Sequence, residues 1–332
     1  MKQPKHEEYA RPSLPAKYAD VAMFKAESFS DVDLTTGVVP KVSLLWMTPD
    51  PMGAIAAMAA MYEGRVIRNL GELTNHDRWR YFQDVLSTHL DTPLEAVKFQ
   101  FLLEGVDRGC THQVVRARHQ TYAQESLRFA VVDDLAGGTS LPPSLWGTDP
   151  TEHPVDIETP EERARAEMRQ VWDNALATVS EAYASLIDRG MPAEEARGLL
   201  PHATATRIIV VTDLRTLKAE AGNRLCTQAQ FHWRILFNGI LNAIREYHGT
   251  GAETWQQEDI ANSALFRPVC YQMGKCPFKA SFDRACSIRG RVDANAEDGI
   301  PSDRWHESHN GSAGRIRHEE WLMDPAAARR RS

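Results

Sequence analysis

Short apolar runs typical of buried strands, set among longer stretches of helical periodicity, limit this chain to a mixed α+β fold. The strand-like runs occupy residues 41–47 (KVSLLWM), 97–103 and 206–212 (TRIIVVT), where large apolar or β-branched side chains dominate. The longest helical stretch extends from Pro160 to Arg189 and is amphipathic. We therefore predict an α+β subunit with long helices, its strands concentrated in the first half of the chain.

Further helices are predicted from capping signals and from the spacing of apolar residues. Asp50-Pro51 opens one of them, because proline is favoured at the first helical position. The other predicted helices span residues 75–90, 107–115, 192–199, 214–222 and 227–247. The stripe of the long helix, which would normally face a core, consists of Val171, Ala175, Val179, Ala182 and Leu186.

The two ends of the chain differ in composition from its middle. Residues 1–38 carry scattered proline and charge without sustained periodicity, and we expect them to form an arm. Residues 39–250 hold the periodic segments and form the predicted main domain. Residues 251–332 form a predicted C-terminal extension with clustered cysteines and a polar tail. A loop rich in glycine, proline and threonine, 137–154, is expected to separate two lobes.

Charge and cysteine content bear on partners and compartment. The chain has 45 aspartates and glutamates against 38 lysines and arginines, a net charge of −7, so we expect no nucleic-acid partner. No run approaches the ~20 apolar residues of a membrane helix, and the N-terminal segment lacks the apolar core of a secretion signal. Five cysteines, an odd number, indicate reduced thiols and a cytoplasmic protein without a membrane partner.

A polar segment with apolar flanks, residues 113–129, is the first candidate for chemistry. If it is extended, Arg116 and Arg118 point to one face, and two guanidinium groups on one face suit a phosphate or pyrophosphate. The alternative is a solvated strand whose arginines form ion pairs. The apolar flanks favour partial burial, and buried arginines need anionic partners.

A second basic cluster lies downstream of the first. Two such clusters in an acidic protein indicate a ligand with several phosphates, such as a nucleotide together with a dinucleotide cofactor. Neither a Walker loop nor a Gly-x-Gly-x-x-Gly fingerprint occurs, so the common phosphate cradles are absent from the sequence. The residues of this second cluster are Arg197, Arg207, Arg215, Lys218 and Arg224.

The first segment resembles the Arg-His-Arg-x7-Ser signature of the flavin-dependent thymidylate synthases. Here Arg116-Ala117-Arg118 is followed, after seven residues, by Ser126. Other segments resemble the same family in the same order, over about residues 40–247. They are residues 92–95 (TPLE), 194–201 (EEARGLLP), 213–217 (DLRTL) and 223–230 (NRLCTQAQ).

The resemblance implies a mixed α/β subunit that forms a homotetramer with shared active sites. It implies binding of FAD, dUMP, methylenetetrahydrofolate and NADPH. A one-carbon unit would pass from the folate to C5 of dUMP, giving dTMP with hydride from reduced flavin. No enzyme cysteine would attack the pyrimidine, which agrees with cysteines that lie outside the signature. Two alternatives stay open: a related hydroxymethylase that forms 5-hydroxymethyl-dUMP, and a non-catalytic nucleotide-binding relative.

Site residues are implied position by position. Arg224 and Ser126 match catalytic positions, and Arg197 with Arg224 match arginines that hold dUMP from another part of the tetramer. All positions matching the dUMP site are Gln113, Arg116, Gln124, Ser126, Arg128, Arg197 and Arg224. Positions matching the FAD site are Thr92, Glu95, Arg116, Arg118, His119, Asp213, Arg215 and Gln228.

The chain departs from the family pattern in these same segments, around the positions that match the dUMP and FAD sites. Ala117 stands where the signature has its middle histidine, and His119 is displaced by two positions. Gln124 replaces a glutamate, with Glu125 beside it. Such changes in the flavin shell motivate the hydroxymethylase alternative. The remaining departures are Asp213 for asparagine, Gln228 for histidine and Ala219 for asparagine.

Three cysteines beyond the family segments, Cys270, Cys276 and Cys286, form a second, independent candidate site. Three thiols within seventeen residues predict a structural zinc or an iron–sulfur cluster. Ordinary buried or free thiols are the alternative. A fourth ligand would be Cys226, His306, His309 or a cysteine of a neighbouring chain.

Overall fold

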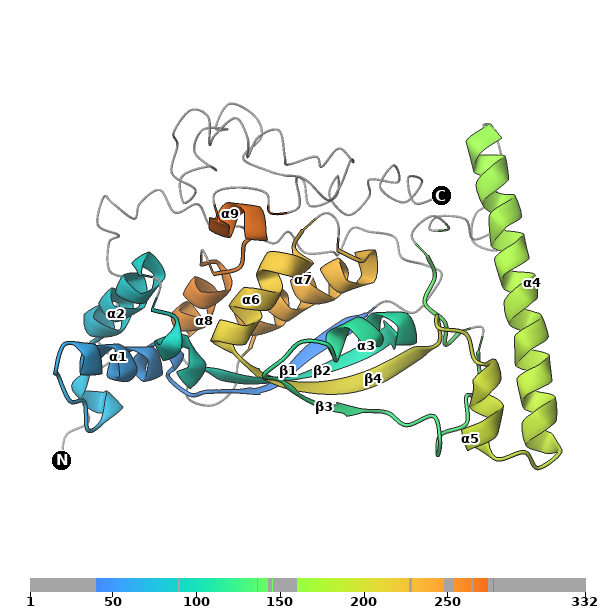
Figure 1. The fold of residues 1–332 in the computed structure, drawn as a ribbon, viewed down its shortest axis with the longest axis horizontal. Helices are drawn as coiled ribbons and strands as arrows, with labels where there is room; N and C mark the ends of the chain where they lie inside the picture. Colours follow the sequence, from blue (N-terminus) through green and yellow to red (C-terminus); the bar gives the residue numbers. More distant parts are fainter. Residues whose placement is uncertain are drawn as a thin grey trace.

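A computed structural model describes residues 40–88, 90–135, 137–142, 145, 160–226, 229–247, 254–263, 265–273 and 277. Strands and helices are arranged as a sheet with helices on one face and at one end (Figure 1). Up to β3 the elements are β1 (Lys41–Met47), α1 (Pro51–Tyr62), η3 (Leu70–Glu72), α2 (Asn75–Ser87), η4 (Thr92–Ala96), β2 (Lys98–Asp107), α3 (Arg108–Val114) and β3 (Thr121–Gln124). They are followed by α4 (Pro160–Asp188), α5 (Ala193–Ala196), η6 (Arg197–Leu199), β4 (Ala205–Asp213), α6 (Leu214–Arg224), α7 (Phe231–Arg245), α8 (Thr254–Ala261) and α9 (Val269–Met273).

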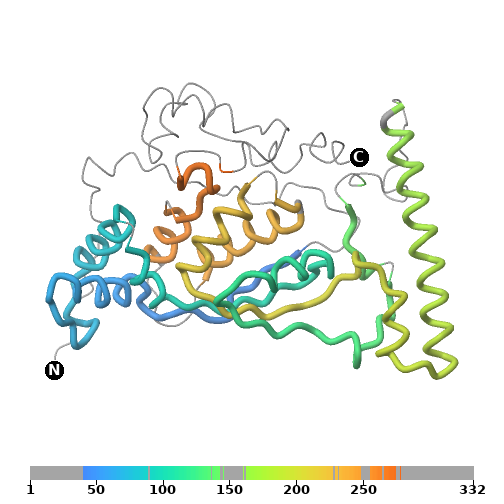
Figure 2. The backbone as a smooth tube through the Cα atoms, in the orientation of Figure 1, coloured from blue at the N-terminus to red at the C-terminus, as the bar shows by residue number. Residues whose placement is uncertain are grey.

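The sheet is antiparallel, with strand order β1-β2-β4-β3. Phe101 of β2 pairs with Leu44 on one side and Val210 on the other, and Val210 pairs with Tyr122 of β3. Helices α3, α6 and α7 lie on one face, and no described element covers the other (Figures 1 and 2). Alternate side chains of β2 and β4 are therefore buried, as a one-sided sheet requires.

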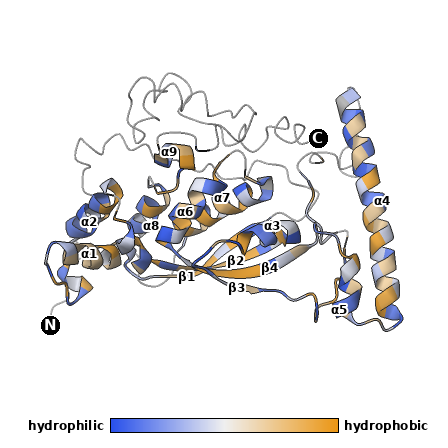
Figure 3. Ribbon diagram, viewed as in Figure 1, coloured by the Kyte–Doolittle hydropathy of each residue, from blue (hydrophilic) through white to orange (hydrophobic). Residues whose placement is uncertain are grey.

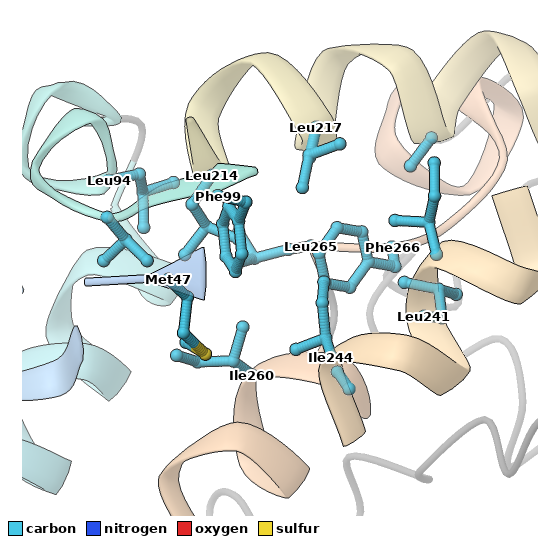
Figure 4. Close-up of a cluster of buried hydrophobic side chains, with 14 of the residues drawn as sticks. Met47, Leu94, Phe99, Leu214, Leu217, Leu241, Ile244, Ile260, Leu265 and Phe266 are labelled. Atoms are coloured by element: carbon cyan, nitrogen blue, oxygen red, sulfur yellow. The ribbon is translucent and has the colours of Figure 1, made fainter. Parts of the chain in front are cut away.

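The core lies between this sheet and helices α6, α7 and α8. Phe99 and Phe101 are fully buried and stack on each other, with ring centroids 5.7 Å apart. Apolar residues from elements far apart in sequence meet in this core, among them Met47 of β1, Leu217 of α6 and Ile260 of α8 (Figure 4). Burying one such large side chain stabilises the fold by roughly 1.5–3 kcal/mol.

Residues beyond 250 contribute to this same core. Ile260 of α8, together with Leu265, Phe266 and Cys270, is buried against the main domain. Gln256 of α8 accepts a hydrogen bond at 3.0 Å from the backbone N–H of Met52. The segment predicted as an extension therefore begins with residues that complete the core, while the rest of that extension lies outside the described residues.

Asp50 links three parts of this region. It adopts a left-handed conformation (φ 51°), which costs energy outside glycine, and caps α1 by accepting from the Gly53 N–H. Arg78 of α2 donates to both its carboxylate oxygens, and Gln256 donates to one. Burial alone would raise the pKa of Asp50, but these bonds outweigh burial and hold the pKa below its ordinary value.

Helix α4 differs from the prediction for its apolar stripe. It stands apart from the sheet and contacts α5 and η6 (Figure 1), and polar and apolar residues alternate along it (Figure 3). Val171 is 70% exposed, Ala175 and Ala182 are also exposed, and the buried residues are Leu176 and Tyr183. The stripe expected to face a core is therefore only partly covered among the described residues, at Val179 and Leu186. Amphipathic periodicity shows that one side is apolar but does not say what covers it.

Most predicted elements are confirmed, including the strand at 206–212 and the short helix after Asp107. The extended conformation assumed for Arg116 and Arg118 is wrong, because residues 115–120 form turns and β3 begins only at Thr121. Both arginines are exposed, so the predicted partial burial is also wrong for this chain. Within the part of the chain that the structure describes, no helix is long and apolar enough to span a membrane.

Candidate functional site

Two groups of predicted site residues lie at opposite ends of β3. Thr121 pairs with Val211, close to the end of β4, whereas Gln124 pairs with Ile208, close to its start. The turn before β3 therefore approaches the junction of β4 with α6. The residues after β3 run towards the region where Arg197 lies, since Glu125 donates its N–H to the Arg207 carbonyl.

At the first end, Asp213 closes β4 and caps α6. Its carboxylate accepts from the Thr216 N–H at 2.8 Å and pairs with Lys98 at 3.0 Å. Burial would raise the pKa of Asp213, but the bonds from Thr216 and Lys98 outweigh burial and hold the pKa below its ordinary value. A position predicted to face flavin is therefore also an anchor of the fold.

Two further ion pairs join η4 to α6 at this junction. Glu95 pairs with Arg215, and this contact raises the pKa of the Arg215 guanidinium. Asp91 pairs with Lys218 at 2.6 Å. The structure thus brings Glu95 and its neighbour in sequence Asp91 into contact with α6, although Thr92 itself is exposed.

Glu95 and Arg215, both predicted flavin-side residues, are therefore in direct contact.

The turn between α3 and β3 carries Arg116, Arg118 and His119. Their side chains are exposed, and the two arginines form no ion pair with any described carboxylate. His119 adopts a left-handed conformation (φ 64°) that reverses the chain before β3. The Tyr122 hydroxyl lies 2.8 Å from the Val114 carbonyl oxygen and 2.7 Å from Gln120 Oε1, which fixes the turn to β3. The turn therefore presents two guanidinium groups that are available to a phosphate or pyrophosphate.

At the other end of β3, Ser126 and Arg128 follow the strand. Arg128 pairs with Glu194 of α5 at 2.9 Å, an exposed ion pair that stabilises the fold little. Gln124, half-buried at the end of β3, donates to the Thr111 hydroxyl at 3.1 Å. Ser126 is half-buried, and its hydroxyl accepts from the Arg128 N–H at 3.3 Å.

Arg108 joins this second group although the sequence did not single it out. Its guanidinium lies 3.5 Å from the Glu125 carbonyl oxygen, next to Ser126. Burial lowers the pKa of Arg108, and the positive charge of Arg197 lowers it further. Two neighbouring guanidinium groups that repel each other favour an anion between them.

Arg224 lies over the helix-covered face of the sheet. It pairs with Glu220 at 2.9 Å, and its guanidinium carbon is 5.1 Å from the centre of the Trp233 ring. Burial and the charge of Glu220 raise the pKa of Tyr122 to about 12, while Arg224 opposes them. The hydroxyl of Tyr122 is therefore neutral near pH 7.

Gln113 of α3 donates its amide N–H to the side-chain oxygen of Gln230, just before α7. Two residues of different segments that resemble the family are thereby in contact. Arg197 donates to the Glu194 carbonyl at 3.0 Å, whereas Arg224 pairs with Glu220. Within the chain the two arginines therefore have different partners.

Sequence reasoning missed side chains that hold the predicted residues. Arg108 approaches the carbonyl oxygen of Glu125, the residue before Ser126. Glu220 and Trp233 both contact Arg224. The spacing of Glu220 four residues before Arg224 was the available signal, because such residues are neighbours on a helix. No local signal links Trp233 to Arg224, since they belong to different helices.

The predicted cysteine site receives no support from the described residues. Cys270 is buried in the core, and no three potential ligands are gathered in this part of the chain. Cys276 and Cys286 lie outside the described residues, as does the predicted flavin residue Gln228. Burial and the nearby charge of Asp107 raise the pKa of the Cys110 thiol, so this cysteine is protonated rather than a nucleophilic thiolate.

Comparison with known proteins gives one consistent family. The profile of the family described as thymidylate synthase complementing protein matches residues 43–248, which include β2, β3, β4 and most of β1. The chain is 33% identical over 207 residues to the flavin-dependent thymidylate synthase of Geobacter sulfurreducens, covering 62% of this chain and 82% of that protein. It is 29% identical over 255 residues to the enzyme of the same name from Pyrococcus horikoshii, covering 76% and 95%.

Proposed function

The chain belongs to the thymidylate synthase complementing protein family, and we propose that it is a flavin-dependent thymidylate synthase. The reaction transfers a one-carbon unit from methylenetetrahydrofolate to C5 of dUMP and forms dTMP. The family match carries this proposal, because it extends over the sheet and over the helices that position the candidate site. The enzyme is a one-carbon transferase.

The residues proposed to bind dUMP lie around β3 and the helices above it. Gln113 and Gln124 have amide groups suited to the polar edge of a pyrimidine, and each is held by a hydrogen bond to a neighbour. Arg197 and Arg224 supply positive charge for the phosphate and for the negative charge that develops on the ring. Arg116, Ser126 and Arg128 complete the proposed set.

The residues present fit an FAD molecule at the turn between α3 and β3. The exposed guanidinium groups of Arg116 and Arg118 suit the pyrophosphate of a dinucleotide. The chemistry that FAD supplies when bound is hydride donation, and NADPH is the proposed co-substrate that supplies its electrons. Thr92, His119 and the ion pair of Glu95 with Arg215 lie on the elements proposed to hold the rest of the cofactor.

We extend the proposal to a homotetramer whose active sites are shared between subunits. Two observations support it. Exposed apolar side chains, Trp46 and Val211, lie on strands whose outer face no described element covers, and Met168 and Val171 are exposed on α4. Arg197 and Arg224 also lie in segments that resemble the family, at positions whose arginines hold dUMP from another part of the tetramer.

Product analysis tests the proposed reaction. Purified protein is incubated with FAD, NADPH, methylenetetrahydrofolate and dUMP, and the nucleotides are identified by mass. We expect dTMP, formed only when every component is present. A hydroxymethylated nucleotide would refute methylation in favour of the hydroxymethylase, and recovery of unchanged dUMP from a protein that binds FAD would refute both reactions.

A further inference from the structure

An aspartate, a histidine and a serine from three separate segments form a continuous polar array. His232 Nδ1 lies 2.9 Å from Asp107 Oδ2, and His232 Nε2 lies 3.1 Å from Ser140 Oγ. The array is secluded from water, because Asp107 is 5% exposed, Ser140 3% and the His232 side chain 13%. Close contacts between buried polar groups fix the relative positions of the segments that carry them.

Each end of the array is anchored to a different part of the candidate site. Asp107 caps α3, the helix of Gln113, because its Oδ1 accepts from the Cys110 N–H at 2.7 Å. Ser140 donates its backbone N–H to the Ala203 carbonyl at 2.8 Å, and Thr139 beside it bridges to Thr204. The array thus joins the start of α3 to the chain that leads from Arg197 into β4.

His232 itself lies in the first turn of α7, between two residues that contact predicted dUMP-binding side chains. Gln230, two positions before it, accepts a hydrogen bond from Gln113. Trp233, the next residue, lies under the guanidinium of Arg224. A shift of this turn would therefore move the partners of Gln113 and Arg224 together.

We propose that His232 is a positioning residue for the nucleotide site, acting through Asp107 and Ser140 on Gln113 and Arg224. This inference rests on the proposed function. Because Ser140 is buried, its hydroxyl serves as a hydrogen-bond partner and not as a nucleophile. The Asp107 carboxylate can only accept a hydrogen, so His232 Nδ1 carries the hydrogen of this contact.

Replacing His232→Leu tests this role. We expect the Kd for dUMP, measured by equilibrium dialysis, to rise about tenfold or more, because the buried hydrogen bond to Ser140 and the close contact with Asp107 are lost. FAD affinity should change by less than about twofold, since Asp107 stands at the start of α3 and the turn that carries Arg116 and Arg118 follows the end of this helix. His76→Leu is the matched control, because His76 is likewise the second residue of its helix but is exposed.

Two conservative variants separate positioning from proton transfer. In Asp107→Asn the amide oxygen still caps α3, while the amide N–H donates to Nδ1 of the other histidine tautomer. A positioning role predicts that this variant keeps its kcat and its dUMP affinity within about threefold of wild type. Ser140→Ala should show part of the loss seen in His232→Leu. A collapse of kcat in Asp107→Asn with unchanged dUMP affinity would overturn the positioning role.

The remaining outcomes are distinguishable. If wild-type protein binds dUMP and His232→Leu and Ser140→Ala bind it equally well, only the positioning role is overturned. A merely structural role for the histidine predicts a different pattern. In that case His232→Leu binds neither FAD nor dUMP and shows no cooperative thermal unfolding transition, while Ser140→Ala binds both ligands with wild-type affinity. If wild-type protein binds no dUMP, the proposed function is overturned, and this inference falls with it.

Discussion

The two places where the chain presents charge to a ligand differ in how that charge is held. At the junction of β4 and α6, Asp213, Glu95 and Arg215 are engaged in ion pairs or caps within the chain. In the turn between α3 and β3, Arg116 and Arg118 are exposed and have no carboxylate partner among the described residues. The first region is preorganised, whereas the second is available to an incoming anion.

This difference teaches which charges belong to the fold and which belong to a ligand. A charge paired within the chain stabilises the structure to an extent that depends on its burial. A guanidinium without a partner contributes little to folding and can bind an anion without first breaking an ion pair. Variants in the two regions should therefore separate ligand binding from stability.

The double variant Arg116→Ala with Arg118→Ala should show the largest effect. We expect the Kd for FAD to rise by a factor of about 100 or more, because two charge-assisted contacts to a pyrophosphate are lost. The thermal midpoint of the protein without ligands should stay within about 2 °C of wild type. Flavin fluorescence titration and calorimetry measure the two quantities, and a large drop in the midpoint would contradict the comparison.

Arg224→Ala should follow in size. Losing a charged partner in a desolvated site typically costs about 2–5 kcal/mol of binding free energy. We expect dUMP binding to weaken accordingly while FAD binding survives, as measured by equilibrium dialysis of both ligands. Equal loss of both ligands would indicate a general structural defect in place of a local role in nucleotide binding.

Asp213→Ala tests the preorganised region. The loss of a helix cap and of the contact with Lys98 should lower the free energy of unfolding at pH 7 by about 1–2 kcal/mol. Because the pKa of Asp213 is lowered in the folded state, its contribution is present above pH 4 and is lost as the pH falls below that value. Urea unfolding at pH 7 and pH 3 should therefore show a smaller difference between variant and wild type at the lower pH.

Arg215→Gln should have the smallest effect on stability. Its ion pair with Glu95 is exposed, so screening by water leaves little net stabilisation. We expect the thermal midpoint to change by no more than about 2 °C, and less in high salt than in low salt. A larger drop that persists at high salt would show that this pair is part of the core architecture.

Local sequence patterns predicted much of the fold. The strand 206–212 and the helix opened by Asp50-Pro51 were visible because β-branched runs and capping residues act over a few positions. Local patterns did not decide the conformation of residues 115–120: an extended segment would have put Arg116 and Arg118 on one face, but the chain turns at His119. They also gave no partner for the stripe of α4 that includes Val171.

The sequence named candidate site residues but could not give their contacts. The order of segments around Arg116, Ser126 and Arg224 was enough to indicate the family, because chemistry fixes residue types at fixed spacings. The contact of Gln113 with Gln230 and of Arg224 with Trp233 joins positions that only packing brings together. These contacts leave no periodic mark on either segment.

The sequence by itself determined the mixed α+β class, most of the elements and the family, since these depend on local periodicity and on motif order. Only the tertiary structure decided that α8 completes the core, that α4 stands apart from the sheet, and that Asp107, Ser140 and His232 form one array. The physical reason is that packing and buried hydrogen bonds act between atoms close in space. Their energies depend on interatomic distances and on burial, and neither can be read from the separation of two residues along the chain.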